Sequence, residues 1–262
     1  MMIDILGIPS RHERYGDRGE PVLLLHGWGV DLDRFLAPVG KALAGQYQVT
    51  ALEFPGHGQT GKPKQPWGVP EYAAWVNALL QALDLGPQTI IAHSFGGRVA
   101  LWLAAHEPQL VRRLVLTGAA GLMREKTAEE QAKAQRYQQQ KQRLEKLSRL
   151  PLIGQTALAA GKKLRDRHSS PDYLALDEDM KATFVRIINQ DLAGLLPNIS
   201  QPTLLIWGTQ DSETPLWMGE KMAKDIPDAA LIPFEGRGHF AYLEELPRFV
   251  SIVQAFIRED SK

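Results

Sequence analysis

A serine at the end of a short apolar run is the side chain best suited to nucleophilic chemistry in this sequence. Ser94 follows the apolar residues 89–92 and precedes a segment of helical spacing from Gly96 to His106. A serine at such a strand–turn–helix junction is held above the carboxyl edge of a sheet, where its hydroxyl can meet a substrate. The turn is sharp, so the residues two before and two after the serine must be small. Here they are Ala92 and Gly96, and Ala92 departs from the common G-x-S-x-G pattern by one methyl group.

A serine hydroxyl needs a base, and His239 is the best placed of the seven histidines. It lies in the glycine-rich segment 236–240, between the last apolar run and the last helical segment, and such a loop reaches the same edge of a parallel sheet. Asp211 follows the preceding apolar run, so it reaches this edge too and can orient the histidine. Glu213 is the alternative acid. His93 is adjacent to the serine, but neighbours in a tight turn point apart, so we do not assign it as the base.

Attack on a carbonyl also requires donors for the developing oxyanion. The backbone N–H of Phe95, directly after the nucleophile, is one expected donor, and that of Trp28, in the loop after Val22–Leu25, is the other. Each donor of this kind is typically worth about 10²–10³ in rate. We also expect the side chains of Trp28, Phe95 and Phe240 to contact the substrate. The chemistry these residues predict is acyl transfer through Ser94, with no metal or organic cofactor.

The elements that must position these residues form a regular alternation. The expected strands are 22–25, 48–52, 89–92, 110–116, 203–207 and 230–233, and the expected helices are 31–44, 70–85, 96–106, 216–226 and 243–257. This pattern predicts an α/β protein with a mostly parallel sheet and helices on both faces. The alternation stops between residues 122 and 197. We therefore predict a helical cap at 122–197, inserted between core segments 1–121 and 198–262.

Five segments in this order resemble the α/β-hydrolase fold superfamily, in particular its small capped serine esterase and C–C hydrolase branches. They are Leu25–Gly29, Phe54–Gly58, Ala92–Gly97, Trp207–Asp211 and Gly238–Phe240. The resemblance covers almost the whole chain, and it implies a catalytic triad of Ser94, Asp211 and His239 acting on a small-molecule carboxylic ester.

The same set of residues is compatible with other activities. C–C bond hydrolysis, amide or peptide cleavage and perhydrolysis use the same parts, and a binding protein of this fold without catalysis is a further alternative. The sequence departs from the family pattern at Glu53, where the family more often has Asp, and at Phe240, where several C–C hydrolases carry Trp. The second departure favours the esterase interpretation.

Composition excludes several classes of function. The chain has no cysteine, which rules out disulfides and thiolate metal sites, and its formal net charge of zero gives no reason to expect a nucleic-acid partner. No apolar run approaches the roughly 18 to 20 residues that a membrane-spanning helix needs. The first twenty residues do not read as a secretory signal, so we expect a cytoplasmic protein.

Charge is unevenly distributed along the chain. Residues 126–167 hold eleven basic and four acidic side chains, a net charge of +7 in a chain whose total is zero. A long helix is expected within this segment, over Thr127–Leu150. Its basic side chains either form a solvated outer face or attract an anionic or amphiphilic ester.

Overall fold

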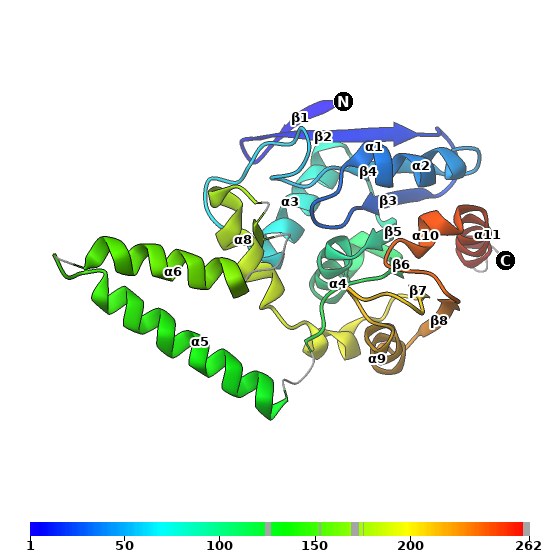
Figure 1. The fold of residues 1–262 in the computed structure, drawn as a ribbon. Helices are drawn as coiled ribbons and strands as arrows, with labels where there is room; N and C mark the ends of the chain where they lie inside the picture. Colours follow the sequence, from blue (N-terminus) through cyan, green and yellow to red (C-terminus); the bar gives the residue numbers. More distant parts are fainter. Residues whose placement is uncertain (124–126, 152, 169–172, 175, 259–262) are drawn as a thin grey trace. The chain divides into compact units, whose positions relative to one another are not determined.

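The computed structural model describes residues 1–123, 127–151, 153–168, 173–174 and 176–258, and its centre is an eight-stranded sheet in the order β1-β2-β4-β3-β5-β6-β7-β8 (Figure 1). The strands are β1 Met2–Ile5, β2 Ile8–Tyr15, β3 Pro21–Leu25, β4 Gln48–Leu52, β5 Gln88–His93, β6 Val111–Thr117, β7 Thr203–Gly208 and β8 Ala229–Phe234. Strand β2 pairs antiparallel with β1 and β4, and all other neighbours are parallel. The predicted α/β class with a mostly parallel sheet is confirmed.

Helices cover both faces of this sheet (Figure 1). The helices of the described chain, including those of residues 124–181 that are not assigned to either face, are α1 Leu32–Phe35, α2 Ala37–Leu43, α3 Val69–Ala82, α4 Phe95–His106, α5 Ala128–Leu147, α6 Gly154–His168, α8 Glu178–Ile188, α9 Trp217–Asp225, α10 Ala241–Glu244 and α11 Leu246–Arg258, with short 3-10 helices at Pro108–Leu110 and Ala193–Asn198. Two expected helices, 31–44 and 243–257, are each divided in two. Pro38 and Pro247 lie in the first turns of α2 and α11, where the missing N–H of proline is tolerated but the preceding helix cannot continue.

All six expected strands are present, each within one residue at its ends. The hairpin β1–β2 was not expected. The hairpin lies at one end of the sheet, where β2 pairs with β4 and β1 is the edge strand. Many of its side chains are exposed, and its sequence, Met2–Tyr15, is accordingly polar or charged at many positions. Sheet edges of this kind carry weak hydrophobic patterning, so periodicity does not reveal them.

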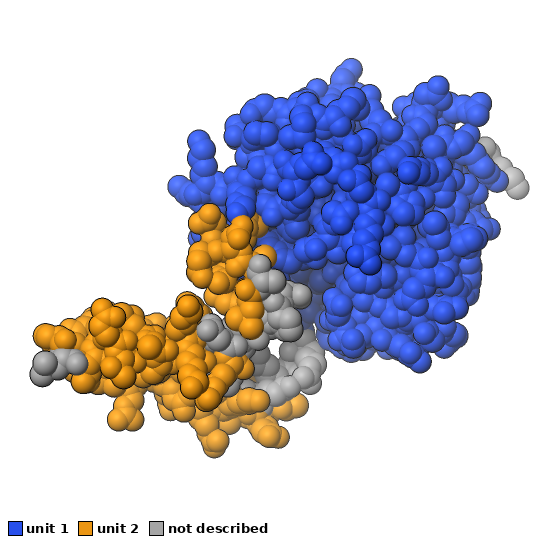
Figure 2. Space-filling model, turned by 45° about the horizontal axis from the view of Figure 1, so that its top comes forward, with its two compact units in different colours: residues 1–123, 182–262 blue, residues 124–181 orange. Residues whose placement is uncertain are grey.

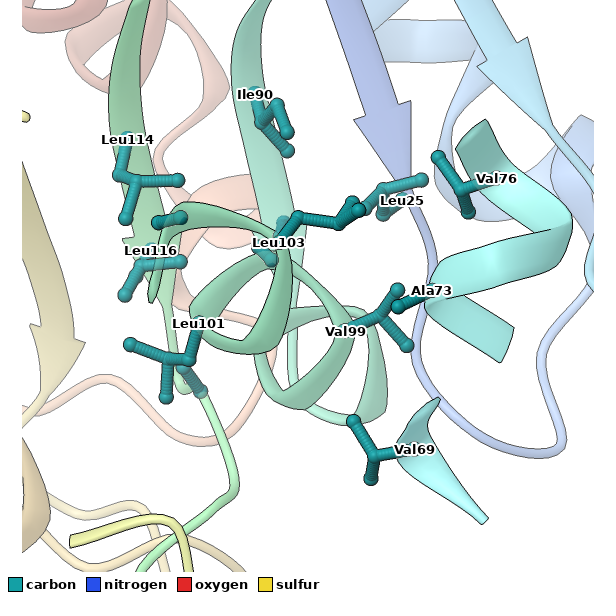
Figure 3. Packing of buried hydrophobic residues seen from close by; sticks show 14 of the residues in the cluster. Leu25, Val69, Ala73, Val76, Ile90, Val99, Leu101, Leu103, Leu114 and Leu116 are labelled. Carbon is teal, nitrogen blue, oxygen red and sulfur yellow. The ribbon is translucent and has the colours of Figure 1, made fainter. Parts of the chain in front are cut away.

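Alternation along the buried strands produces two hydrophobic cores, one on each face of the sheet. In β3, Leu23 and Leu25 face a core that includes side chains of α3, α4 and α9. Val22 and Leu24 face the other core, which includes side chains of α2, α10 and α11. Figure 3 shows the first core, where Val99 and Leu103 of α4 lie among side chains of strands and of α3.

The chain forms two compact units (Figure 2). Unit 1 comprises residues 1–123 and 182–262, and unit 2 comprises residues 124–181. Unit 2 lies within the segment 122–197 predicted as a cap and contains α5 and α6. Lys126, the first residue of the basic segment 126–167, lies outside the described residues. The division into a hydrolase core and a cap stays a prediction. In the part of the chain that the structure describes, no helix has the length and apolarity needed to cross a membrane.

Candidate active site

The turn that carries Ser94 has the strained geometry expected of a nucleophile. Strand β5 ends at His93, α4 begins at Phe95, and Ser94 between them has φ +50° and ψ −111°. A positive φ is costly for a residue with a side chain, and such strain is typical of functional sites. The serine is partly exposed although its neighbours on both sides are buried. The local fold thus presents the Ser94 hydroxyl at the carboxyl edge of the sheet.

Small residues after the serine allow α4 to approach the sheet. A Cβ on Gly96 would lie 2.6 Å from the carbonyl oxygen of Leu25, and one on Gly97 would lie 2.4 Å from the Cβ of Ala119. Neither position can hold a larger residue without movement of the backbone. Ala92 is fully buried in β5, so the methyl group that departs from the common motif is accommodated.

Asp211 and His239 come together at this same edge. The loop after β7 carries Asp211, the loop after β8 carries His239, and Asp211 Oδ2 lies 2.8 Å from His239 Nδ1. The Asp211 carboxylate is fully buried, whereas the His239 side chain is 7% exposed. A carboxylate on Nδ1 fixes the imidazole with its proton on that nitrogen and leaves Nε2 to act as a base.

Thr214 completes the surroundings of the carboxylate. The N–H groups of Glu213 and Thr214 each donate to Asp211 Oδ1 at 2.9 Å, and the Thr214 hydroxyl lies 2.8 Å from Oδ2. The same hydroxyl lies 2.9 Å from the carbonyl of Gly118. Its one proton can serve only one of these acceptors, and the charged carboxylate is the stronger acceptor.

These contacts explain the acidity of Asp211. Burial alone would raise the pKa of this carboxyl, but the hydrogen bond and charge of His239, together with the N–H and hydroxyl of Thr214, outweigh burial and hold the pKa below its usual range. Thr214 was not among the residues expected at the site. Its spacing from Asp211 could have indicated it, because an Asp carboxylate often accepts hydrogen bonds from the residues two and three positions later in a turn.

His93, the residue before Ser94, links the serine turn to His239. His93 contacts the His239 carbonyl through Nε2 at 3.0 Å, which ties the residue before Ser94 to the base. Within the described residues, no hydrogen bond joins the Ser94 hydroxyl to His239. His239 Nε2 instead lies 3.4 Å from Glu213 Oε2, on a side chain that is 62% exposed. Asp211, and not the alternative acid Glu213, therefore contacts Nδ1.

The two expected oxyanion donors are free of other partners. The N–H groups of Trp28 and Phe95 have no hydrogen-bond acceptor in the ranges that the structure describes. Their rings contact one another, with centroids 5.3 Å apart, and Trp28 also contacts Phe184 of α8 at 5.4 Å. Phe240 does not join this group, because its ring packs against Phe35 at 4.9 Å.

Three further histidines lie near the site, and all are held neutral. Burial lowers the pKa of His26 to about 3, that of His57 to about 4 and that of His93 to about 3. His26 accepts the N–H of Phe54 on Nε2 at 2.9 Å, which fixes its proton on Nδ1. These three rings therefore stay uncharged at neutral pH.

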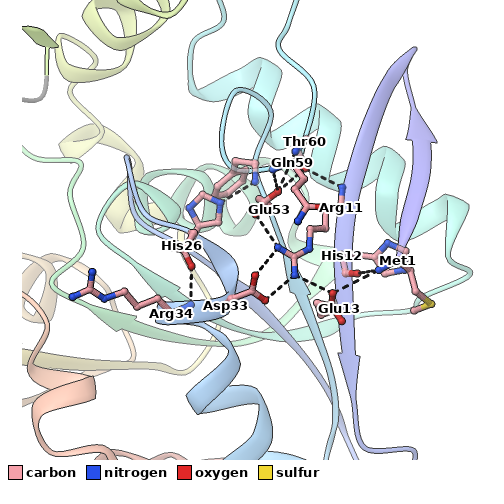
Figure 4. A network of polar contacts seen from close by, with 12 residues as sticks. Met1, Arg11, His12, Glu13, His26, Asp33, Arg34, Glu53, Gln59 and Thr60 are labelled. Carbon is pink, nitrogen blue, oxygen red and sulfur yellow. Dashed lines mark hydrogen bonds and ion pairs between the residues drawn. The ribbon is translucent and has the colours of Figure 1, made fainter. Parts of the chain in front are cut away.

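A buried carboxylate holds the loop after β4 in place (Figure 4). Glu53 is fully buried and accepts the N–H groups of Gln59 at 2.6 Å and Thr60 at 3.0 Å. Arg11 lies 3.6 Å from Glu53 and also forms a bidentate contact with Asp33. Glu53 thus anchors the turn that carries His57, and its contacts lie with the loop and not with the catalytic candidates.

Comparison with known proteins agrees with this architecture. A sequence model of the α/β-hydrolase fold family matches residues 20–246. A 2-hydroxymuconate semialdehyde hydrolase of Pseudomonas putida is 30% identical over 93% of this chain and 89% of its own length. A pimeloyl-[acyl-carrier protein] methyl ester esterase of Chromobacterium violaceum is 28% identical over 89% of this chain and 92% of its own. The crystal structure of an enol-lactonase from Burkholderia xenovorans LB400 superposes with a TM-score of 0.75 at 21% identity, covering 99% of this chain and 100% of that one, a similarity of fold alone.

Proposed function

The chain belongs to the α/β-hydrolase fold family, and from this premise we propose that it is a serine hydrolase that cleaves a small-molecule carboxylic ester through an acyl-enzyme intermediate. The observation that carries the proposal is the 2.8 Å hydrogen bond between His239 Nδ1 and Asp211 Oδ2, at the sheet edge where Ser94 occupies its strained turn. A base oriented in this way is what a serine nucleophile needs.

In the first step the Ser94 hydroxyl attacks the ester carbonyl while His239 Nε2 takes its proton. The side chain of Ser94 turns toward Nε2 for this transfer and takes the place that Glu213 holds at 3.4 Å. Such hydrogen bonds are often long before substrate binds. The N–H groups of Trp28 and Phe95 stabilise the oxyanion, and Asp211 stabilises the imidazolium.

Collapse of the tetrahedral intermediate breaks the ester bond. His239 Nε2–H donates its proton to the departing alkoxide, which leaves as the alcohol, and the acyl group remains on Ser94 Oγ. A water molecule then attacks the acyl carbonyl and gives its proton to Nε2. The second tetrahedral intermediate releases the carboxylic acid and returns Ser94 to its starting state.

The similar proteins favour two bond types. The methyl ester esterase at 28% identity supports ester cleavage, and the semialdehyde hydrolase at 30% identity supports cleavage of a C–C bond next to a carbonyl as the second candidate. Phe240, where several C–C hydrolases carry Trp, favours the ester. Parallel assays with p-nitrophenyl esters and with 2-hydroxymuconate semialdehyde would separate the two by kcat/KM.

Unit 2 supports a preference for an anionic or amphiphilic ester. Helices α5 and α6 line a pocket of about 340 Å³ that is open to solvent on one side. Aliphatic and basic side chains both line it, among them Leu144, Leu158 and Lys162. Apolar surface beside positive charge suits a substrate with a chain and a charged group. On this proposal kcat/KM for an anionic ester falls more steeply with rising salt than kcat/KM for a neutral ester of equal size, because salt screens the attraction of the basic segment. Equal salt dependence for neutral and anionic esters would contradict it.

Labelling with a fluorophosphonate, followed by intact-mass measurement, tests the nucleophile. We expect one adduct on the wild type and on Ser251→Ala, an exposed serine of α11, and none on Ser94→Ala. The folded wild type remaining unlabelled would overturn the proposed function. A series of p-nitrophenyl esters of increasing acyl length then defines the substrate, since kcat/KM should rise to a maximum at the length that fills the pocket.

A further inference from the structure

His93 is a buried side chain that the mechanism above does not use. Only 2% of it is exposed, and its ring lies directly behind the catalytic turn. Its centroid is 4.6 Å from that of His239, 4.9 Å from that of Phe240 and 5.0 Å from that of Tyr242. The ring is thus packed against the base on one side and against the start of α10 on the other.

The contacts of the two ring nitrogens define its protonation. Nε2 lies 3.0 Å from the carbonyl oxygen of His239, and a carbonyl can only accept, so Nε2 carries the proton and donates. Nδ1 is buried and has no hydrogen-bond partner among the described residues. A Cβ on Gly27 would lie 2.9 Å from this nitrogen, so glycine at that position leaves room for the ring.

The charge state of the ring suits a place beside the base. Burial, reinforced by the nearby His239, lowers the pKa of His93 to about 3, so the ring stays neutral at physiological pH. A neutral neighbour adds no repulsion when His239 becomes an imidazolium during catalysis. The ring can therefore hold the base without opposing its protonation.

We infer that His93 is a positioning residue. Its Nε2–H donates to the main-chain carbonyl of His239 and so fixes the base relative to Ser94, which follows His93 in the chain. The inference rests on the proposed function for its kinetic consequence. Its physical basis is that residues 93 and 94 are adjacent, so one hydrogen bond ties the nucleophile turn to the base loop. Other contacts of this loop, such as the N–H of Gln210 on the Arg237 carbonyl at 2.9 Å and the N–H of Gly238 on Glu244 at 3.1 Å, are made before His239 in the chain, whereas His93 contacts the main chain of His239 itself.

A pair of amide substitutions tests the inference, because they differ only in reach. In His93→Gln the amide N–H can occupy the place of Nε2 and donate to the carbonyl, whereas in His93→Asn it ends at the place of Nδ1. Displacements of about 1 Å can cost a factor of about 10² in rate. With p-nitrophenyl butyrate we expect His93→Asn to lower kcat by about that factor with KM changed less than threefold, and His93→Gln to stay within about fivefold of wild type.

Two controls separate positioning from loss of a buried ring. His12→Gln replaces another buried histidine, on β2, and should lower Tm without changing kcat. The downfield ¹H NMR signal of the proton between His239 Nδ1 and Asp211 Oδ2 reports the geometry of the base without any substrate. We expect it to exchange with water at least about tenfold faster in His93→Asn than in His93→Gln, as the loop opens.

Equal kcat and equal exchange rates in the Gln and Asn variants would overturn the inference, whether both variants are impaired or neither is. If His93→Asn does not fold, wild type is compared with His93→Gln alone. A loss of kcat of more than tenfold in His93→Gln at unchanged Tm would then overturn the inference. If the wild type neither reacts with fluorophosphonate nor cleaves esters, the proposed function fails. The NMR comparison then still decides the positioning role.

Discussion

The hydroxyl of Thr214 gives the sharpest test of the site. Thr214→Val keeps the shape of the side chain and the N–H that donates to Asp211 Oδ1. It removes the hydroxyl, which lies 2.8 Å from Asp211 Oδ2, 2.9 Å from the Gly118 carbonyl and 3.2 Å from His239 Nδ1. A hydrogen bond to a charged group contributes about 1.5–3 kcal/mol. Since about 1.4 kcal/mol corresponds to a factor of ten in rate, kcat should fall by about 10- to 100-fold if the bond supports the transition state.

The same substitution should change how the stability of the protein depends on pH. The pKa of Asp211 is lowered in the folded protein, so its charge stabilises the fold above the ordinary pKa near 3.8, and this stability is lost as pH falls through the lower folded value. Removing the Thr214 hydroxyl raises the folded pKa. Acid unfolding should therefore begin at higher pH in Thr214→Val than in the wild type.

The matched control is Thr203→Val at the other end of β7. Thr203 is also buried and donates its hydroxyl to a carbonyl, that of Gln201, at 2.9 Å. Its loss should cost about 1 kcal/mol of unfolding free energy, measured by urea denaturation, and leave kcat unchanged. Thr214→Val with kcat within twofold of wild type, or an equal loss of kcat in Thr203→Val, would refute the reasoning.

Four further outcomes follow from the same contacts. Asp211→Asn should lower kcat by about 10⁴-fold in steady-state ester assays, because the amide no longer fixes the tautomer of the base. Glu213→Gln should instead raise kcat/KM for anionic esters by about fivefold, because it removes a negative charge that repels them, and a charge in water at about 4 Å contributes about 1 kcal/mol. The kcat/KM for neutral esters should stay unchanged. A loss of kcat comparable to that of Asp211→Asn would make Glu213 the orienting acid. Glu53→Gln should lower the unfolding free energy by about 3–5 kcal/mol in urea, because it leaves Arg11 and the loop N–H groups without their buried charge. Gly96→Ala should abolish folding or fluorophosphonate labelling, whereas Gly86→Ala, with nothing within 4 Å of the added methyl, should leave Tm within a few degrees of wild type.

The central parallel strands could be predicted because they are buried on both faces. Residues 22–25 and 90–92 are continuous apolar runs, and a short run of this kind between turn residues is typical of a buried strand. The hairpin β1–β2 could not be predicted, because its stability comes from pairing with β4 at a distance in sequence, which no local pattern records. The same applies to helix breaks, where one proline outweighs a continuous apolar period.

The candidate site was predictable in its residue types and only partly in its contacts. The order of Ser94, Asp211 and His239, each after a strand, follows from the topology of a parallel sheet. The sequence analysis set His93 aside because neighbours in a tight turn point apart. His93 in fact turns its ring toward the loop of His239, where Nε2 contacts the His239 carbonyl. Side-chain direction at a strained turn depends on φ and ψ, which spacing does not give.

Environment, not residue type, selects the base among the histidines. Desolvation keeps His26, His57 and His93 neutral, and in the part of the chain that the structure describes no carboxylate contacts their rings. His239 differs in having a buried carboxylate at 2.8 Å, so a proton taken up there is paired at once. The Asp211 carboxylate is in turn kept ionised by the N–H groups of Glu213 and Thr214 and the Thr214 hydroxyl, and these donors stay in place when His239 gains or loses a proton. A site built in this way places positive charge on one ring only, and it follows that Asp211→Asn should damage catalysis more than removal of any of the other three rings.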